Sequence, residues 1–133
     1  MSPRRPLLVN ADDLEHWSDR YDAAAKLPLL VRRLVLAARG VTNVSFRTEA
    51  GVRLGGWDGF CEGTEPSPYV AVGPAGWEFS VQKDGIAAKA TDDFNKRAAE
   101  PDAAQIIFVF LTSRRWGGKH AWTKGSRNNN IYI

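Results

Sequence analysis

Two acidic residues, Asp58 and Glu78, are the side chains of this sequence that are best suited to bind a metal ion. Asp58 lies in the run Gly-Gly-Trp-Asp-Gly, and Glu78 lies in the run Trp-Glu-Phe-Ser. Two carboxylates that converge can hold a hard divalent cation through their oxygen atoms. Such a cation and a nearby lysine are the minimum equipment for metal-assisted cleavage of a phosphodiester bond. The alternatives are a turn aspartate that bonds to its own backbone and an exposed strand glutamate.

Three lysines follow Glu78 and are candidates to complete such a site. Lys83 comes five residues later, so in a regular strand it would point to the opposite face, unless the break at 84–85 re-aims it. Lys89 falls about one turn into the next helix, from which its side chain can reach back over the sheet edge. Lys96 lies on roughly the same helical face. The alternative for each lysine is a solvated helix face.

Apolar periodicity and turn residues predict the elements that must position these side chains. A first helix is capped by Asn10 or Asp12, and a second covers 26–39 with Gly40 as its stop. The later elements are predicted in this order: a strand from Val44 to Thr48, a turn at 49–51, strands at 53–62 and 76–83, a helix at 86–100, a strand at 104–112, a short helix and a last strand. This order predicts an α/β fold with a mixed central sheet and helices on both faces.

The pairing of the strands decides whether the two acids meet. If strands 53–62 and 76–83 are antiparallel neighbours, Asp58 and Glu78 face one cation from adjacent strands. Glycines 55, 56 and 59 permit a bulge or a close approach by a ligand. The unit 76–112 should form a right-handed parallel crossover. Its second strand is almost continuously apolar, so we expect it in the middle of the sheet, buried on both faces.

On these residues and this order of elements, the chain resembles the PD-(D/E)XK nuclease superfamily, which includes restriction-endonuclease-like and Mrr-like domains. That family has an αβββαβ core, with an aspartate on the second strand and an acidic residue, any residue, then lysine on the third. Asp58 and Glu78 match the two acidic positions. Ser80 stands where the family has its lysine. Members of the family move that lysine to the following helix, and Lys89 is the natural substitute.

The resemblance implies a metal-dependent endonuclease, a hydrolase that cleaves nucleic acid. Asp58, Glu78 and the backbone carbonyl of Phe79 would hold Mg²⁺ or Mn²⁺. Lys89, with Lys83 as second choice, would position the attacking water and offset negative charge. A domain without a lysine in the site would be a degenerate nuclease fold, acting as a non-catalytic module that binds nucleic acid or a protein partner.

Composition and charge restrict the remaining possibilities. A chain of 133 residues fits one domain, and its net charge of +3 is too mild to indicate nucleic acid by itself. The segment 114–127 is basic and aromatic without acidic residues, which suits a phosphate backbone, although a solvated amphipathic helix has the same pattern. The basic residues expected to contact the backbone, with DNA as the expected partner, are Arg97, Arg114, Arg115 and Lys119.

Other chemistries have weaker support in the sequence. His16 and His120 lack serine, aspartate or cysteine partners at the spacing of a catalytic triad. The single cysteine, Cys61, excludes an internal disulfide and is expected to be buried. No apolar run is long enough to span a bilayer, and no signal peptide is evident, so a cytoplasmic location is the default expectation.

The alternating residues at the very end, Ile131 to Ile133, indicate a strand without a following turn or polar tail. We therefore expect residues 1–133 to be a single nuclease-like domain at the N-terminus of a longer protein. The chain is also similar to N-terminal nuclease-like domains of large bacterial proteins, including antiviral STAND NTPases. This similarity implies an effector nuclease of anti-phage defence that forms homo-oligomers through further domains. A pure oligomerisation domain is the remaining alternative.

Overall fold

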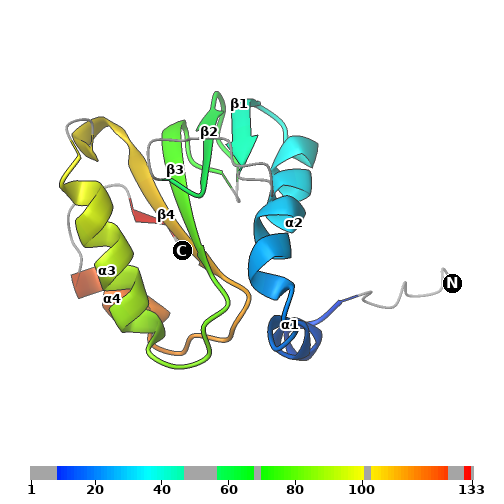
Figure 1. Cartoon of the computed structure of the whole chain (residues 1–133). Helices are drawn as coiled ribbons and strands as arrows, with labels where there is room; N and C mark the ends of the chain where they lie inside the picture. The colour runs from blue at the N-terminus through cyan, green and yellow to red at the C-terminus, as the bar shows by residue number, and fades with distance from the viewer. Residues whose placement is uncertain (1–8, 47–56, 68–69, 101–102, 126–130, 133) are drawn as a thin grey trace, which may run out of the picture.

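The computed structural model describes residues 9–46, 57–67, 70–100, 103–125 and 131–132. Helices pack against both faces of a central sheet, so the predicted mixed α/β architecture is confirmed (Figure 1). The elements are α1 Ala11–Ser18, α2 Ala23–Ala37, β1 Val41–Phe46, β2 Gly59–Gly63, β3 Gly73–Ser80, α3 Ile86–Ala98, a 3₁₀ turn η1 Ala103–Gln105, β4 Ile107–Thr112, α4 Lys119–Gly125 and β5 Ile131–Tyr132.

The strands lie side by side in the order β1-β2-β3-β4-β5. β1 pairs with β2, and β2 with β3, in antiparallel fashion, whereas β4 is parallel to both β3 and β5. β3 and β4 are parallel and are joined through α3, so the predicted parallel crossover is present. Two parallel strands need a long return segment between them, and α3 provides it. The antiparallel pairing of β2 and β3 is the relationship on which the convergence of Asp58 and Glu78 depends.

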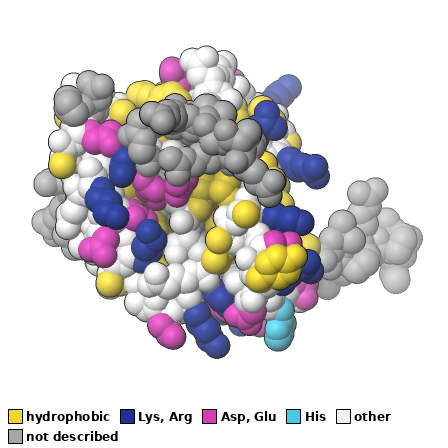
Figure 2. Space-filling view, in the orientation of Figure 1, with side chains coloured by type: hydrophobic (Ala, Val, Ile, Leu, Met, Phe, Trp, Pro, Cys, Tyr) yellow, Lys and Arg dark blue, Asp and Glu magenta, His cyan; other side chains and the backbone are white. Residues whose placement is uncertain are grey.

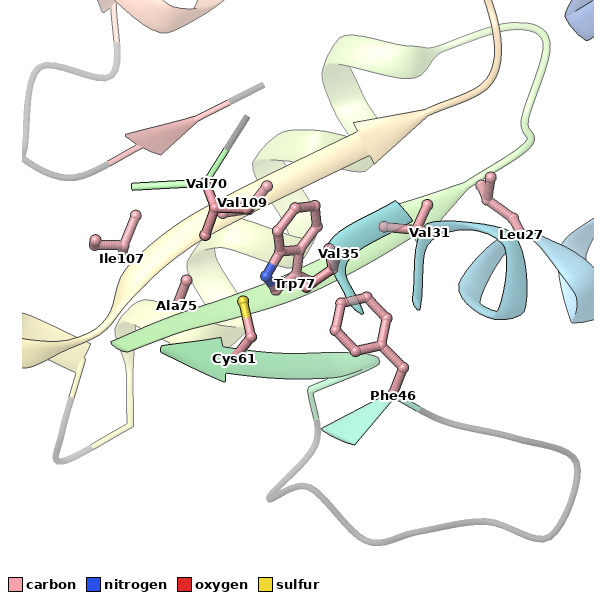
Figure 3. Packing of buried hydrophobic residues seen from close by; sticks show 10 residues of the cluster. All are labelled: Leu27, Val31, Val35, Phe46, Cys61, Val70, Ala75, Trp77, Ile107 and Val109. Carbon is pink, nitrogen blue, oxygen red and sulfur yellow. The ribbon is translucent and has the colours of Figure 1, made fainter. Parts of the chain in front are cut away.

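Alternation along β3 and β4 divides the core between the two faces of the sheet. Ala75, Trp77, Ile107 and Val109 point to the face covered by α2 and pack there with buried side chains of that helix. Figure 3 shows this cluster, with Phe46, Cys61 and Trp77 pointing toward one another. Cys61 is fully buried, as predicted, and burial raises the pKa of its thiol.

The opposite face of the sheet is covered by α3 and α4. Its buried side chains are Trp57, Ile86, Ala90, Phe108 and Phe110, with Phe94, Trp116 and Trp122 packed around them. The indole of Trp122 also donates to the Thr91 hydroxyl of α3 at 3.0 Å. Glu78 and Ser80 alternate with Trp77, so both side chains lie on this face, beneath α3.

The helix ends follow local sequence rules. Asn10 caps α1 in a capping box, in which its side chain accepts from the Asp13 amide and the Asp13 carboxylate accepts from the Asn10 amide. Gly85 precedes α3 with a φ of 66°, a left-handed conformation that glycine adopts without steric cost. This glycine turns the chain from β3 into α3, and the helix then runs back along the sheet over Glu78.

Some predicted boundaries differ from the structure. β3 spans 73–80 rather than 76–83, so Lys83 follows the strand instead of ending it. α2 begins at Ala23 and takes Pro28 into its interior. Proline there removes only the bond to the Ala24 carbonyl, and the exposed position of Ala24 lets water replace it. Thr48, the turn at 49–51, residues 53–56 with glycines 55 and 56, residues 126–130 and Ile133 lie outside the described residues.

None of the helices in the described part of the chain combines the length and the apolar character needed to cross a membrane.

Candidate functional site

Asp58 is fixed by the residues on either side of it and by β3. The ring of the preceding Trp57 lies flat over Gly76 of β3, where any larger side chain would collide with the indole. The Asp58 amide donates to the Trp77 carbonyl at 3.0 Å, and the Phe79 amide donates to Asp58 Oδ2 at 3.0 Å. Asp58 therefore extends the hydrogen-bonded ladder of β2 and β3 by one residue. The Phe79 amide, which would donate to a backbone carbonyl in a regular ladder, donates to the Asp58 carboxylate instead.

Glu78 lies beside Asp58 on the face of β3 that α3 covers. The side chain of Glu78 is 8% exposed, and the two carboxyl groups share a hydrogen bond. Burial, followed by the hydrogen bond with Asp58 and the negative charges of Asp58 and Asp93, raises the pKa of Glu78 to about 9. Arg97 acts in the opposite direction but does not outweigh these causes. Glu78 is therefore protonated at neutral pH and donates to Asp58.

Successive turns of α3 present Lys89, Asp93 and Arg97 to these carboxyl groups. Lys89 Nζ lies 2.9 Å from Asp93 Oδ1. The hydrogen bond with Asp93 raises the pKa of Lys89, and the charges of Asp93, Glu78 and Asp58 add to this effect. The ammonium thus lies within the electrostatic influence of both predicted metal ligands. Figure 2 shows acidic and basic side chains interspersed along α3 beside the sheet.

Arg97 approaches Glu78 from the next turn of α3. Its Nε lies 3.2 Å from Glu78 Oε1, and its terminal nitrogen lies 2.7 Å from Glu100 Oε1. The guanidinium also stands over the ring of Trp57, 5.8 Å from the ring centroid. Only 16% of the Arg97 side chain is exposed. Arg97 is therefore part of the site itself, together with Asp58, Glu78, Lys89 and Asp93; these five residues are called the carboxylate cluster below.

No protein-family model matches the chain, and neither a curated protein nor a solved structure does. Function is therefore inferred from the chemistry of the carboxylate cluster.

Asp93 is the member of the cluster that sequence reasoning missed. It is 4% exposed, and among the described residues its Oδ2 atom has no hydrogen-bond partner. A carboxylate is rarely buried unless a partner compensates for its lost hydration. The available signal was its spacing: Asp93 lies four residues after Lys89, and seven after Ile86 on the helical stripe that also buries Ala90.

The donor set fits a divalent cation with two carboxylate ligands. Within the described ranges, no group of three or more histidine, cysteine, aspartate or glutamate side chains is arranged to hold a metal. Asp58 and Glu78 are nevertheless close enough to share a proton, and a cation can replace that proton between two oxygen ligands. The amide and carbonyl of one strand residue point to the same edge, so the Phe79 carbonyl faces the edge where its amide meets Asp58.

The other candidates lie away from the cluster. Lys83 is exposed beyond the end of β3, and its charge acts on Asp19, next to α1, rather than on Glu78. Lys96 is exposed on α3, so of the three candidate lysines the structure brings only Lys89 to the acidic pair.

The basic segment after β4 is divided between structural and exposed roles. Arg114 joins distant parts of the fold, because it donates to the Val81 carbonyl at 2.9 Å and pairs with Glu15 at 3.0 Å and Asp19 at 2.8 Å. Its side chain is only 6% exposed, so partners inside the fold occupy the guanidinium, and its contact with a nucleic-acid backbone stays a prediction. Arg115 is exposed and pairs with Asp12.

Lys119 begins the short helix α4 and is half-buried. Trp116 and Trp122 of the same segment pack against the core beneath α3. Both rings are half-buried and thus contribute to the packing of this face of the sheet.

Proposed function

We propose that the chain is a metal-dependent nuclease domain that hydrolyses phosphodiester bonds of nucleic acid, with DNA as the expected substrate. The observation that carries this proposal is the contact between the Asp58 and Glu78 carboxyl groups under the influence of the Lys89 ammonium. A buried pair of acids is costly unless a proton or a cation lies between them. Asp58 directly before β2 and Glu78 on β3 lie close to the two acidic positions that the resemblance to a restriction-endonuclease-like core implies.

The order of the elements supports the same proposal. α2, β1, β2, β3, α3 and β4 follow one another as helix, three strands, helix and strand. The acidic residues lie next to the second strand and on the third, and the lysine lies on the helix after it. We place the domain on this basis in a nuclease of bacterial anti-phage defence, as the resemblance implies.

The roles of the residues follow from their positions. Asp58, Glu78 and the Phe79 carbonyl would hold Mg²⁺ or Mn²⁺, which supplies polarisation of the scissile phosphate and acidification of a water molecule. Lys89 would orient the attacking water through its N–H groups and offset the negative charge that develops on the phosphate. Asp93 keeps the Lys89 side chain in place through the ion pair at 2.9 Å. Arg115 and Lys119 would contact the nucleic-acid backbone without reading its sequence.

A second candidate function is a non-catalytic module built on the same fold. Two observations favour it: Ser80 occupies the usual lysine position, and Arg97 already lies against one of the two predicted metal ligands. In such a module the guanidinium permanently neutralises the site, and the domain binds nucleic acid or a protein partner without cleaving.

A cleavage assay tests the proposal against this alternative. The full chain is incubated with supercoiled plasmid and Mg²⁺ or Mn²⁺, beside Asp58→Asn, Glu78→Gln and Lys89→Met. Each of these variants should lose about a hundredfold or more of the cleavage rate while its circular dichroism stays unchanged. Asp92→Asn, at an exposed neighbouring position of α3, is the matched control and should cleave like wild type. Retarded plasmid mobility without cleavage in wild type supports the non-catalytic module instead.

A further inference from the structure

We propose that Arg97 is a built-in competitor of the divalent cation, so that cation binding requires the guanidinium to leave Glu78. This inference rests on the proposed function, since it concerns the same pair of carboxylates. Its basis is the distance of 3.2 Å between Arg97 Nε and Glu78 Oε1. An oxygen that faces a guanidinium at this distance cannot also coordinate a metal ion from the same direction.

Three contacts hold the guanidinium in this position. One edge meets Glu78, the terminal nitrogen meets Glu100 at 2.7 Å, and the plane stands over Trp57 at 5.8 Å. Little of the side chain reaches solvent. A planar, weakly hydrated guanidinium with several fixed donors is suited to such a buried contact, whereas a lysine would make it with a single point charge. Arg97 is thus anchored from two sides while it contacts the predicted ligand.

The two cations that α3 brings to the site are held in different ways. Lys89 has its own acidic partner in Asp93, which lies outside the predicted ligand set. Arg97 pairs with Glu78 within the site and with Glu100, which lies just beyond the C-terminal end of α3. Lys89 can therefore stay in place when a divalent cation enters, but Arg97 must give up one of its contacts.

The consequence is a coupling between Arg97 and cation affinity. A divalent cation that binds Asp58 and Glu78 loses part of its binding free energy to the displacement of Arg97 and to the repulsion between like charges. Removal of the guanidinium should relieve both costs. Arg97 already contacts Glu100 and can keep this ion pair after it leaves Glu78, so its displacement does not require α3 to unfold.

Calorimetric titration with Mn²⁺ alone tests this inference on the full chain, without any measurement of cleavage. Arg97→Gln should bind Mn²⁺ about tenfold more tightly than wild type. Arg97→Met should show the same gain and keeps an aliphatic chain over Trp57, in case the glutamine variant folds poorly. Lys96→Gln is the matched control, because it removes one positive charge from the neighbouring, exposed position of the helix. Its affinity should equal that of wild type.

Equal or weaker Mn²⁺ binding by both Arg97 variants overturns the inference, and so does an equal gain in Lys96→Gln. Asp58→Asn separates this failure from failure of the metal site. If wild type binds Mn²⁺, Asp58→Asn abolishes binding and the Arg97 variants match wild type, the metal site stands and Arg97 is no competitor. If neither wild type nor any of the variants binds Mn²⁺, both the inference and the metal-dependent function are wrong.

Discussion

The Glu78 carboxyl on β3 forms a hydrogen bond with the carboxyl of Asp58, the residue directly before β2. β2 and β3 run antiparallel, and the ladder continues past β2 through the bonds of Asp58 with Trp77 and Phe79. The indole of Trp57, seated over Gly76, fixes the chain just before Asp58. The backbone, rather than any flexible side chain, therefore brings the two acids together.

Glu78 should make the stability of the fold depend on pH. Its pKa is about 9 in the folded protein against an ordinary 4.5, so between these values the folded state holds a proton that the unfolded state lacks. The contribution of Glu78 is fully present below pH 4.5 and declines as pH rises toward 9. We expect the free energy of unfolding of wild type, relative to Glu78→Gln, to fall by up to about 1.4 kcal/mol per pH unit.

Urea unfolding of both proteins at several values between pH 5 and pH 8 measures this difference. Glutamine has the shape of the protonated acid and does not titrate, so its variant should be the more stable protein at pH 8. A constant difference between the two proteins across this range is incompatible with a buried, protonated Glu78.

Asp93 should matter for cleavage through Lys89. Asp93→Asn removes the charge that holds the ammonium at 2.9 Å and leaves the size of the side chain unchanged. We expect the cleavage rate to fall by about 10- to 100-fold, the usual effect of losing a group that orients a catalytic residue. Asp92→Asn is the exposed control. Wild-type rates in Asp93→Asn would show that Lys89 needs no such support.

Gly76 should be intolerant of any side chain. In Gly76→Ala the added methyl group would collide with the Trp57 ring. Overpacking of this kind costs about 1–3 kcal/mol, and a displaced Trp57 carries Asp58 away from Glu78. Chemical denaturation and Mn²⁺ titration should therefore both be affected. Gly117→Ala is the matched control, since no described atom lies within 4 Å of its added methyl. Unchanged Mn²⁺ binding in Gly76→Ala would disprove this role for Trp57.

Substitution of Arg114 should lower the stability of the fold, whereas substitution of Arg115 should weaken nucleic-acid binding. Arg114→Met removes the side-chain donor to the Val81 carbonyl and leaves the Glu15 carboxylate with the Arg115 amide as donor, which should cost about 1–3 kcal/mol of unfolding free energy. Arg115→Met should leave the denaturation midpoint unchanged but weaken binding to a short DNA duplex. Denaturation and a fluorescence binding assay on both variants check this. The reverse pattern would return Arg114 to the nucleic-acid surface.

Local patterns in the sequence predicted much of this arrangement. Alternation in β3 identifies the face of Glu78, and the Asp-Gly break followed by a helical period places Lys89 above it. The antiparallel neighbours β2 and β3 then bring Asp58 close. These inferences needed only periods of two and 3.6 residues and the usual pairing of consecutive strands.

The contacts that the sequence did not reveal depend on how separate elements of the fold come together. Arginine is usually a surface residue, and only the folded structure, which brings α1 and Asp19 to the segment after β4, reveals Glu15 and Asp19 as partners of Arg114. Arg97 was expected to contact a nucleic-acid backbone, and its contact with Glu78 depends on how α3 packs over β3. Asp93 contradicts the general preference of aspartate for the surface, and its four-residue spacing from Lys89 was the only signal in the sequence of the ion pair that compensates for its burial.

A crystal of the full chain soaked in Mn²⁺ shows whether Asp58 and Glu78 bind one cation. We predict an anomalous difference peak between the carboxyl oxygens of Asp58 and Glu78, within about 2.0–2.6 Å of both, the usual range for hard cations and oxygen ligands. We also predict that Arg97 has moved away from Glu78. A well-diffracting soaked crystal with no peak there, or with Mn²⁺ bound only elsewhere, contradicts this prediction.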